Sequence, residues 1–245
     1  METPPHVRPD MALFLDFDGT LVDLAPRPEQ VAVSPGVVDT LSRLQVCLDG
    51  AVAVISGRPI AEIDHFLDPL QLPAAGLHGL EHRKAVGADI IRDKPTGAIA
   101  QLKADLEASD LLTNGVFLEN KGVALAVHYR ANPDREEDVR GVMQEAVAGL
   151  DNLHLVEGKM VIEAKPATSD KGRAVEAFMA HAPFKDRTPV FIGDDVTDED
   201  GLAAAQRLGG LGVKVGMGQT CAHYRLSSVP AVHAWLTSNF LALEH

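Results

Sequence analysis

The chain is poor in cysteine and has no long apolar run. Its 245 residues include only two cysteines, Cys47 and Cys221, which stand far apart and lack the spacing of a metal-ligand pair. Such usage is typical of reduced thiols and excludes a disulfide framework. The longest apolar runs, such as residues 51–55, are too short to span a bilayer. We therefore expect neither a disulfide scaffold nor a membrane segment.

Positive charge is also scarce. The sequence has 22 Lys and Arg against 35 Asp and Glu, which gives a formal net charge of −13. Nucleic acids and anionic membranes bind basic surfaces that displace their counterions, so neither is expected as a partner. An anionic small molecule would need local neutralisation by a metal ion or by placed lysines.

The amino end lacks the form of a secretory signal, because Pro4, Pro5, Pro9 and Asp10 precede only a short apolar run. We therefore expect a cytoplasmic protein. The sequence leaves the oligomeric state open, with a monomer as the working expectation.

The apolar pattern predicts an α/β protein with a parallel sheet flanked by helices and a second unit inserted into it. Strands at 11–17 and 51–55 flank a helix at 35–48 and form a right-handed βαβ unit. After residue 84, helices alternate with hairpins, which indicates a small antiparallel sheet with helices on one face. The expected division is a core of residues 1–83 and 166–245 around an inserted domain of residues 84–165. The remaining predicted elements are helices near 59–66, 96–112, 133–150, 170–181 and 197–208, hairpins at 116–129 and 153–165, and a strand at 189–192.

Three apolar strands each end in reactive polar residues. These ends read DFDGT at 16–20, Ser56-Gly57, and GDD at 193–195. Because the carboxyl ends of parallel strands open on one crevice, we expect these residues to form a composite site.

Two acids of this site favour a metal ion. Asp16 and Asp18 are two residues apart, so in an extended chain their carboxylates point to the same side and repel each other. A divalent cation between them and a third acid, Asp194, would remove that repulsion. With no His or Cys nearby, these oxygen ligands favour Mg²⁺ over zinc. The alternative is that the acids are solvated loop residues.

The neighbouring residues suit a phosphoryl group. Gly19 and Thr20 would turn the backbone so that its N–H groups face a phosphoryl oxygen. The Ser56 hydroxyl and the Gly57 N–H would hold another. Lys171 stands in the first turn of a helix, where the helix dipole disfavours a cation, so its ammonium invites a functional role between carboxylate and phosphate. Taken singly, Ser56 or Lys171 has a structural alternative.

The order of these motifs resembles the four-motif signature of the haloacid dehalogenase superfamily: DFDGT, then Ser56, then Lys171, then GDDVTDED at 193–200. The resemblance implies a Rossmannoid core with an inserted α/β cap. It also implies that Asp16 is the nucleophile that attacks phosphorus, and that Asp18 is the general acid and then the general base.

The same resemblance implies how Mg²⁺ is held. Its ligands would be Asp16, the backbone carbonyl of Asp18, and Asp194. Asp195 or Asp198 would support the metal from behind, and the sequence does not decide between them.

The inserted segment places charged residues on strand faces. Glu119 and Lys121 share one face of a strand, and Glu163 and Lys165 share one face of another. Carboxylate and ammonium groups together suit sugar hydroxyls, which need both acceptors and donors. The residues alone equally allow ordinary salt bridges across the strands.

Five segments of the chain read VISGRP at 54–59, GLHGLEHR at 76–83, LENKGVALAVHYR at 118–130, VEGKMVIEAKP at 156–166 and GDDVTDED at 193–200. These segments are similar to the trehalose-6-phosphate phosphatases. The similarity implies hydrolysis of trehalose 6-phosphate in trehalose biosynthesis through an aspartyl-phosphate, with Glu119, Lys121 and Glu163 contacting the glucose ring remote from the phosphate. His78 and Arg130 are further candidates for the cleft.

Three alternatives stay open at this point. A related phosphatase could act on sucrose phosphate or a mannosyl phosphoglycerate. A signalling receiver module also combines an acidic pocket with a lysine, but its acidic pair should precede the phosphorylated Asp, whereas here the pair at 194–195 comes last. A catalytically inactive sugar-phosphate sensor is not favoured, because every expected catalytic position is filled.

Overall fold

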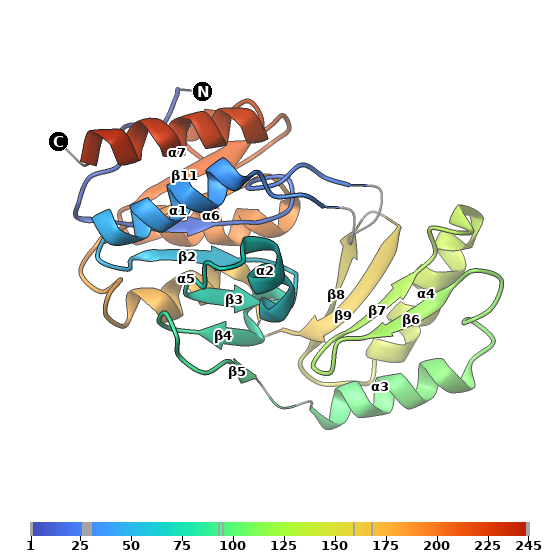
Figure 1. Cartoon of the computed structure of the whole chain (residues 1–245). Coiled ribbons are helices and arrows are strands. Elements are labelled where there is room, and N and C mark those ends of the chain that lie inside the picture. The colour runs from blue at the N-terminus through green and yellow to red at the C-terminus, as the bar shows by residue number, and fades with distance from the viewer. Residues whose placement is uncertain are drawn as a thin grey trace. The chain divides into compact units, whose positions relative to one another are not determined.

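The chain forms two compact units (Figure 1). Our computed structural model describes residues 2–25, 31–92, 94, 96–158, 160–167 and 169–243. Unit 1 consists of Met1–Ile91 and Asp170–His245, and unit 2 consists of Arg92–Ser169. Unit 2 is therefore an insertion within unit 1. Its use as a cap over a substrate stays a prediction.

Unit 1 is built on an eight-stranded sheet with the order β12-β11-β10-β1-β2-β3-β4-β5. The strands from β12 to β3 are parallel to their neighbours, and β4 runs antiparallel to β3. The strands are β1 Met11–Leu15, β2 Val52–Ile55, β3 Ala74–Gly76, β4 Glu81–Arg83, β5 Ile91–Arg92, β10 Thr188–Gly193, β11 Leu211–Val215 and β12 Tyr224–Leu226; the helices are α1 Pro35–Cys47, α2 Ile60–Leu67, α5 Lys171–Met179, α6 Glu199–Arg207 and α7 Val229–Leu243.

Two pairs of helices pack on this sheet (Figure 1). Helix α1 packs with α7, and α5 packs with α6. The chain passes from β1 to β2 in one direction along the sheet and from β10 to β11 in the other. Right-handed crossovers in opposite directions place α1 and α6 on opposite faces. This explains why every residue of β1 is buried and apolar.

The reversal of direction lies between β1 and β10, where open α/β sheets bind their ligands. The two strands pair in parallel with Leu15 beside Ile192. The Asp16 N–H donates to the Ile192 carbonyl at 2.9 Å. Asp16 and the residues after Gly193 therefore leave the sheet next to each other.

Unit 2 is a four-stranded antiparallel sheet with two helices on one face. Alternate residues of the two central strands, Leu125, Val127, Ile162 and Ala164, join apolar residues of both helices in one cluster. The predicted alternation of helices and hairpins is confirmed in unit 2. The strands are β6 Phe117–Asn120, β7 Leu125–His128, β8 Leu153–Gly158 and β9 Val161–Pro166, in the order β6-β7-β9-β8, and the helices are α3 Gly97–Ala108 and α4 Glu136–Val147.

Helix α3 ends earlier than the sequence predicts, at Ala108 and not near residue 112. The Ser109 hydroxyl donates to the Leu106 carbonyl at 2.7 Å and accepts the Leu111 N–H at 3.3 Å. Such side-chain bonds compete with the helical ladder, so the helix stops there. Across the described ranges, no helix combines the length and apolarity that crossing a bilayer requires.

The core of unit 1 depends on Phe14, whose ring lies 5.3 Å from that of Phe184. We expect Phe14→Ala to lower the free energy of unfolding of unit 1 by about 3–5 kcal/mol, because it leaves a cavity among buried rings. The chain's single tryptophan, Trp235, lies in the same core, so its fluorescence in a urea titration reports on this unit. The control Val46→Ala alters a side chain that is 76% exposed and should change stability by less than about 0.5 kcal/mol. Equal unfolding midpoints for the two variants would contradict the prediction.

Candidate active site

Three carboxylates meet at the adjoining tips of β1 and β10. Asp16, Asp194 and Asp198 each contribute an oxygen, and these oxygens lie within 4.8 Å of one another. Asp16 is 3% exposed and Asp198 is fully buried in the 3-10 turn Val196–Asp198. The structure thus brings together two of the three acids that the sequence indicated for a metal, with Asp198 in place of the Asp18 side chain.

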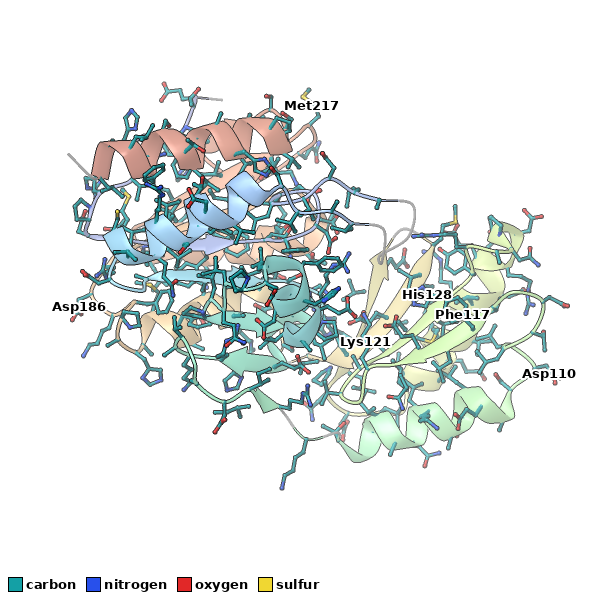
Figure 2. All side chains as sticks on the ribbon, viewed as in Figure 1. Asp110, Phe117, Lys121, His128, Asp186 and Met217 are labelled. Atoms are coloured by element: carbon teal, nitrogen blue, oxygen red, sulfur yellow. The ribbon has the colours of Figure 1, made fainter. Side chains whose placement is uncertain are left out.

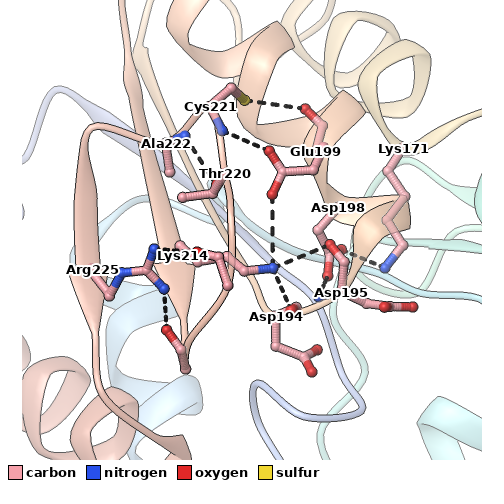
Figure 3. A network of polar contacts seen from close by, with 12 residues as sticks. Lys171, Asp194, Asp195, Asp198, Glu199, Lys214, Thr220, Cys221, Ala222 and Arg225 are labelled. Carbon is pink, nitrogen blue, oxygen red and sulfur yellow. Dashed lines mark hydrogen bonds and ion pairs between the residues drawn. The ribbon is translucent and has the colours of Figure 1, made fainter. Parts of the chain in front are cut away.

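Lys171 is the cation of this cluster. Its Nζ donates to Asp16 Oδ1 at 2.7 Å and to Asp198 Oδ1 at 2.6 Å. Lys171 is the first residue of α5, which Asp170 caps. A positive charge is unfavourable at the start of a helix, and two buried ion pairs offset this cost. Figure 3 shows Lys171 directed at Asp198.

Asp198, and not Asp195, is the acid that contacts Lys171. The other oxygen of Asp198, Oδ2, accepts the Asp195 N–H at 2.8 Å. Asp195 therefore contributes its backbone to the arrangement. Whether Asp198 or Asp195 would support a metal ion stays a prediction, for which these contacts favour Asp198.

The cluster carries more negative than positive charge. Burial, followed by the nearby charge of Asp198, raises the pKa of Asp16 well above its ordinary value, although Lys171 opposes this. Burial, followed by the charges of Asp198 and Asp195, raises the pKa of Asp194 to about 6. Burial lowers the pKa of Lys171, but its two carboxylate partners outweigh this and the net change is upward. One ammonium does not balance the acids around it.

A divalent cation fits this charge surplus and these donors. Asp194 Oδ1 is buried and has no hydrogen-bond partner within the described part of the chain. Gly19 has a φ of +82°, and a Cβ there would lie 2.2 Å from Asp194 Oδ2, so a glycine is required for the two segments to come this close. A cluster of carboxylate oxygens suits a hard cation. The acidic cluster could therefore hold a metal ion.

The Asp18 carboxylate is occupied elsewhere. Arg58 Nε donates to Asp18 Oδ2 at 2.6 Å, and Arg58 Nη2 donates to Asp18 Oδ1 at 2.7 Å. Arg58 is 8% exposed. Our reading of the sequence did not single out Arg58, although an arginine directly after Ser56-Gly57 at a strand end was a signal for it.

The expected phosphate-binding residues differ in what they offer. The Thr20 hydroxyl is buried and unpartnered among the described residues. The Gly19 N–H donates to the Val22 carbonyl at 2.7 Å and the Thr20 N–H to the Phe17 carbonyl at 3.4 Å. The expectation that these two N–H groups face a phosphoryl oxygen is therefore corrected, because both donate to carbonyls within a turn. The Thr20 hydroxyl is the group that could contact a phosphoryl oxygen.

Ser56 and Gly57 follow β2. Ser56 is 1% exposed, and its hydroxyl accepts the Arg58 N–H at 3.2 Å. A Cβ on Gly57 would lie 2.8 Å from His78 Nε2, so His78 packs directly against this glycine. His78 thus lies beside an expected phosphate-binding residue, whereas Arg130 belongs to unit 2.

A second buried lysine, Lys214 of β11, braces the Asp194 segment (Figure 3). Its Nζ donates to the Asp194 carbonyl and lies 3.5 Å from the Asp195 carbonyl and 3.7 Å from Glu199 Oε1. Our reading of the sequence missed it. The signal was a lysine inside the apolar run LGVKV.

The predicted sugar-binding residues lie on one face of the unit 2 sheet. Lys121 Nζ donates to Glu163 Oε2 at 2.8 Å, and Glu119 Oε2 lies 2.8 Å from His128 Nε2. The Phe117 ring stacks on His128 at 4.6 Å and 7° (Figure 2). The salt bridge across the strands that the sequence allowed is therefore present between Lys121 and Glu163. His128 and Phe117 lie on the same face, and the sequence had not indicated them.

The fold is that of the haloacid dehalogenase-like hydrolases. A haloacid dehalogenase-like hydrolase from B. subtilis has the same fold, with a TM-score of 0.69, 13% identity and coverage of 93% of this chain and 99% of that one. The C-terminal domain of C. albicans trehalose-6-phosphate phosphatase gives a TM-score of 0.79 at 21% identity, covering 94% and 91% of the two chains.

Sequence similarity gives the family. The profile of the trehalose-phosphatase family matches residues 14–229. Over 240 residues the chain is 41% identical to the trehalose-6-phosphate phosphatase of Escherichia coli K12. The matched region covers 98% of this chain and 90% of that protein. The chain belongs to the trehalose-phosphatase family and is a phosphoric monoester hydrolase.

Cation binding at this cluster should depend on pH, because a cation needs the ionised form of Asp194. Since the pKa of Asp194 is raised to about 6, its protonated fraction grows as the pH falls through that value. We expect the affinity for Mg²⁺, used as the probe in calorimetry, to be nearly constant above about pH 7 and to fall by up to about tenfold per pH unit below about pH 5. Asp194→Asn should bind more weakly and show a shallower dependence. An affinity for the unaltered protein that is equal at both ends of this range would rule the prediction out.

Proposed function

We propose that this enzyme hydrolyses trehalose 6-phosphate to trehalose and phosphate, through an aspartyl-phosphate on Asp16 and with Mg²⁺. The observation that carries the proposal is the cluster of buried Asp16 and Lys171 with half-buried Asp194 at the strand tips, in a chain 41% identical to an enzyme named for this substrate. The expected cytoplasmic location and monomeric state stay predictions.

The metal would be held by Asp16, Asp194 and the backbone carbonyl of Asp18, with Asp198 close by. The all-oxygen donor set and the unpartnered Asp194 Oδ1 support Mg²⁺ as the ion. When bound, it would neutralise negative charge on the phosphoryl oxygens. Lys171 adds a second positive charge at the same carboxylate, and it stays protonated because its pKa is raised by Asp16 and Asp198 against the effect of burial.

The first half of the reaction uses Asp16 as nucleophile. A carboxylate oxygen of Asp16 forms a bond to phosphorus while the bond from phosphorus to the sugar oxygen breaks. Asp18 in its protonated form gives its proton to that oxygen, and trehalose leaves. The phosphoryl oxygens are held by the Lys171 ammonium and by the hydroxyls of Thr20 and Ser56, with the Gly57 N–H as a further donor.

The second half uses the same two acids. Asp18, now ionised, takes a proton from water, whose oxygen bonds to phosphorus as the bond to Asp16 breaks. Phosphate is released, Asp16 is regenerated, and Asp18 is again protonated. Each proton that Asp18 gives is thus recovered in the same cycle.

The remote glucose ring would be recognised by Glu119, Lys121 and Glu163 in unit 2. The Lys121 and Glu163 side chains are 16% and 11% exposed, so each is partly accessible while held by the other. The pair offers donors and acceptors that suit sugar hydroxyls. The Glu119 carboxyl accepts a hydrogen bond from His128, which lowers its pKa and keeps it an acceptor.

The substrate assignment is tested with a panel of phosphorylated sugars. Purified enzyme with Mg²⁺ should release phosphate from trehalose 6-phosphate at least about 100-fold more efficiently, in kcat/KM, than from glucose 6-phosphate, sucrose 6-phosphate or a mannosyl phosphoglycerate, since several hydroxyl contacts are lost with each. Phosphate release is measured colorimetrically for all four. Equal efficiencies would refute the assignment while leaving the phosphatase intact.

Lys121 should act only on the sugar end of the substrate. We expect Lys121→Ala to lower kcat/KM for trehalose 6-phosphate by about 10- to 100-fold, because it removes a charged donor and leaves Glu163 without its partner. Hydrolysis of p-nitrophenyl phosphate, which lacks the sugar, should be unchanged. Lys103→Ala on α3 is the matched control, because Lys103 also pairs with a glutamate but on an exposed surface. A loss of equal size on both substrates would contradict the role.

A further inference from the structure

We propose that Arg58 is a positioning residue that keeps the Asp18 carboxylate out of the cation site. The proposal deepens the proposed function, on which it rests for the role of Asp18 in proton transfer. Its starting point is a contrast within one motif. Asp16 and Asp18 are two residues apart, yet only Asp16 belongs to the carboxylate cluster, whereas Asp18 forms a two-point ion pair with Arg58.

The ion pair engages the whole carboxylate. Each oxygen of Asp18 accepts from a different nitrogen of Arg58, at 2.6 and 2.7 Å. The planar guanidinium matches a carboxylate in this way, and it carries its charge at every pH at which the enzyme works. A carboxylate held at both oxygens is fixed in position, so it cannot turn toward the cluster unless it gives up one of these bonds.

Arg58 is itself held in place on several sides. Its Nη1 donates to Glu62 at 3.1 Å, and its guanidinium lies 5.0 Å from the centre of the Phe66 ring and 5.7 Å from that of Phe17. The Asp18 side chain, by comparison, is 30% exposed. The better-fixed partner is therefore the arginine, and it determines where the carboxylate lies.

The arrangement has a chemical consequence. A carboxylate that ligates a metal ion is deprotonated, so Asp18 could not serve as the proton donor while it bound the cation. Asp18 carries a proton only when one of its two bonds to Arg58 has opened, which its 30% exposed side chain permits. With Asp16, Asp194 and Asp198 already close together, a fourth acid at the cluster would add an oxygen ligand and lose its function in proton transfer. Arg58 separates the acid that moves protons from the acids that face the cation.

The test measures Mg²⁺ binding by calorimetry, without substrate. Arg58→Met removes both hydrogen bonds but keeps an unbranched apolar chain over the rings. We expect Mg²⁺ to bind about tenfold more tightly, because the freed Asp18 carboxylate becomes an additional ligand. Asp18→Asn alone should change the affinity by less than about twofold, and in the double variant Arg58→Met with Asp18→Asn the gain should disappear.

Kinetics provide a second readout. Arg58→Met should lower kcat for trehalose 6-phosphate by about 100-fold or more and change KM by less than about threefold, because it disturbs proton transfer and not sugar binding. Arg58→Lys restores one contact and should recover part of kcat. Arg43→Met is the matched control, since Arg43 also pairs with an aspartate, at 3.0 Å, and lies 5.0 Å from a phenylalanine ring, and it should leave Mg²⁺ affinity and kcat unchanged.

The proposal is overturned if Arg58→Met leaves Mg²⁺ affinity unchanged or weaker, or if the gain persists in the double variant. If circular dichroism shows that Arg58→Met does not fold, Asp18→Asn and Arg58→Lys decide. A marked loss of Mg²⁺ affinity in Asp18→Asn would mean that the carboxylate already binds the cation. Arg58→Lys should tighten binding by a smaller factor, and no change there would count against the proposal. These binding results do not depend on which sugar phosphate is the substrate.

Discussion

The structure depends on the placing of like charges at the adjoining tips of two parallel strands. Register puts Asp16 beside the residues that follow β10, so the buried carboxylates of Asp16 and Asp198 meet the half-buried carboxylate of Asp194. Lys171 offsets only part of their repulsion. Burying acids without full compensation destabilises a folded protein, and here the remaining charge surplus is what makes the cluster able to hold a cation.

Neighbouring cations assign different tasks to acids of one residue type. Lys171 binds Asp16 and Asp198 within the cluster. Lys214 binds the backbone of Asp194, which leaves that carboxylate directed at the cluster. Arg58 binds both oxygens of Asp18. The aspartates are chemically identical in sequence, and only their partners in the folded chain distinguish them.

Most of the site residues that the sequence could predict lie directly after strands. The runs MALFL and PVFIG are continuous and apolar, so the buried strands and the acids after them could be predicted from the sequence. The meeting of the strand tips followed from the parallel arrangement of such strands.

 The three-residue strand β3 and helix α7, whose apolar residues lie all round, show no clear period and were not predicted. Contacts such as Arg58 with Asp18 and Lys214 with the Asp194 carbonyl join segments far apart in sequence. They are set by packing, which spacing along the chain does not encode.

In the proposed function, the two units would recognise different parts of the substrate, because each contains a different kind of chemistry. Unit 1 holds the concentrated charge that a phosphoryl group and a cation require, and Asp16, Lys171 and Asp198 of its cluster are buried. The polar face of unit 2 carries the paired side chains Lys121 with Glu163 and Glu119 with His128, which contact each other at 2.8 Å in both pairs. A neutral sugar offers hydroxyls and no charge. Donors and acceptors that are already fixed in place bind such a group best, because little side-chain entropy is then lost on binding. In the proposed function the phosphate therefore provides the electrostatic attraction and the sugar face provides the selectivity, and a substrate that lacks either part loses only the corresponding share of the interaction.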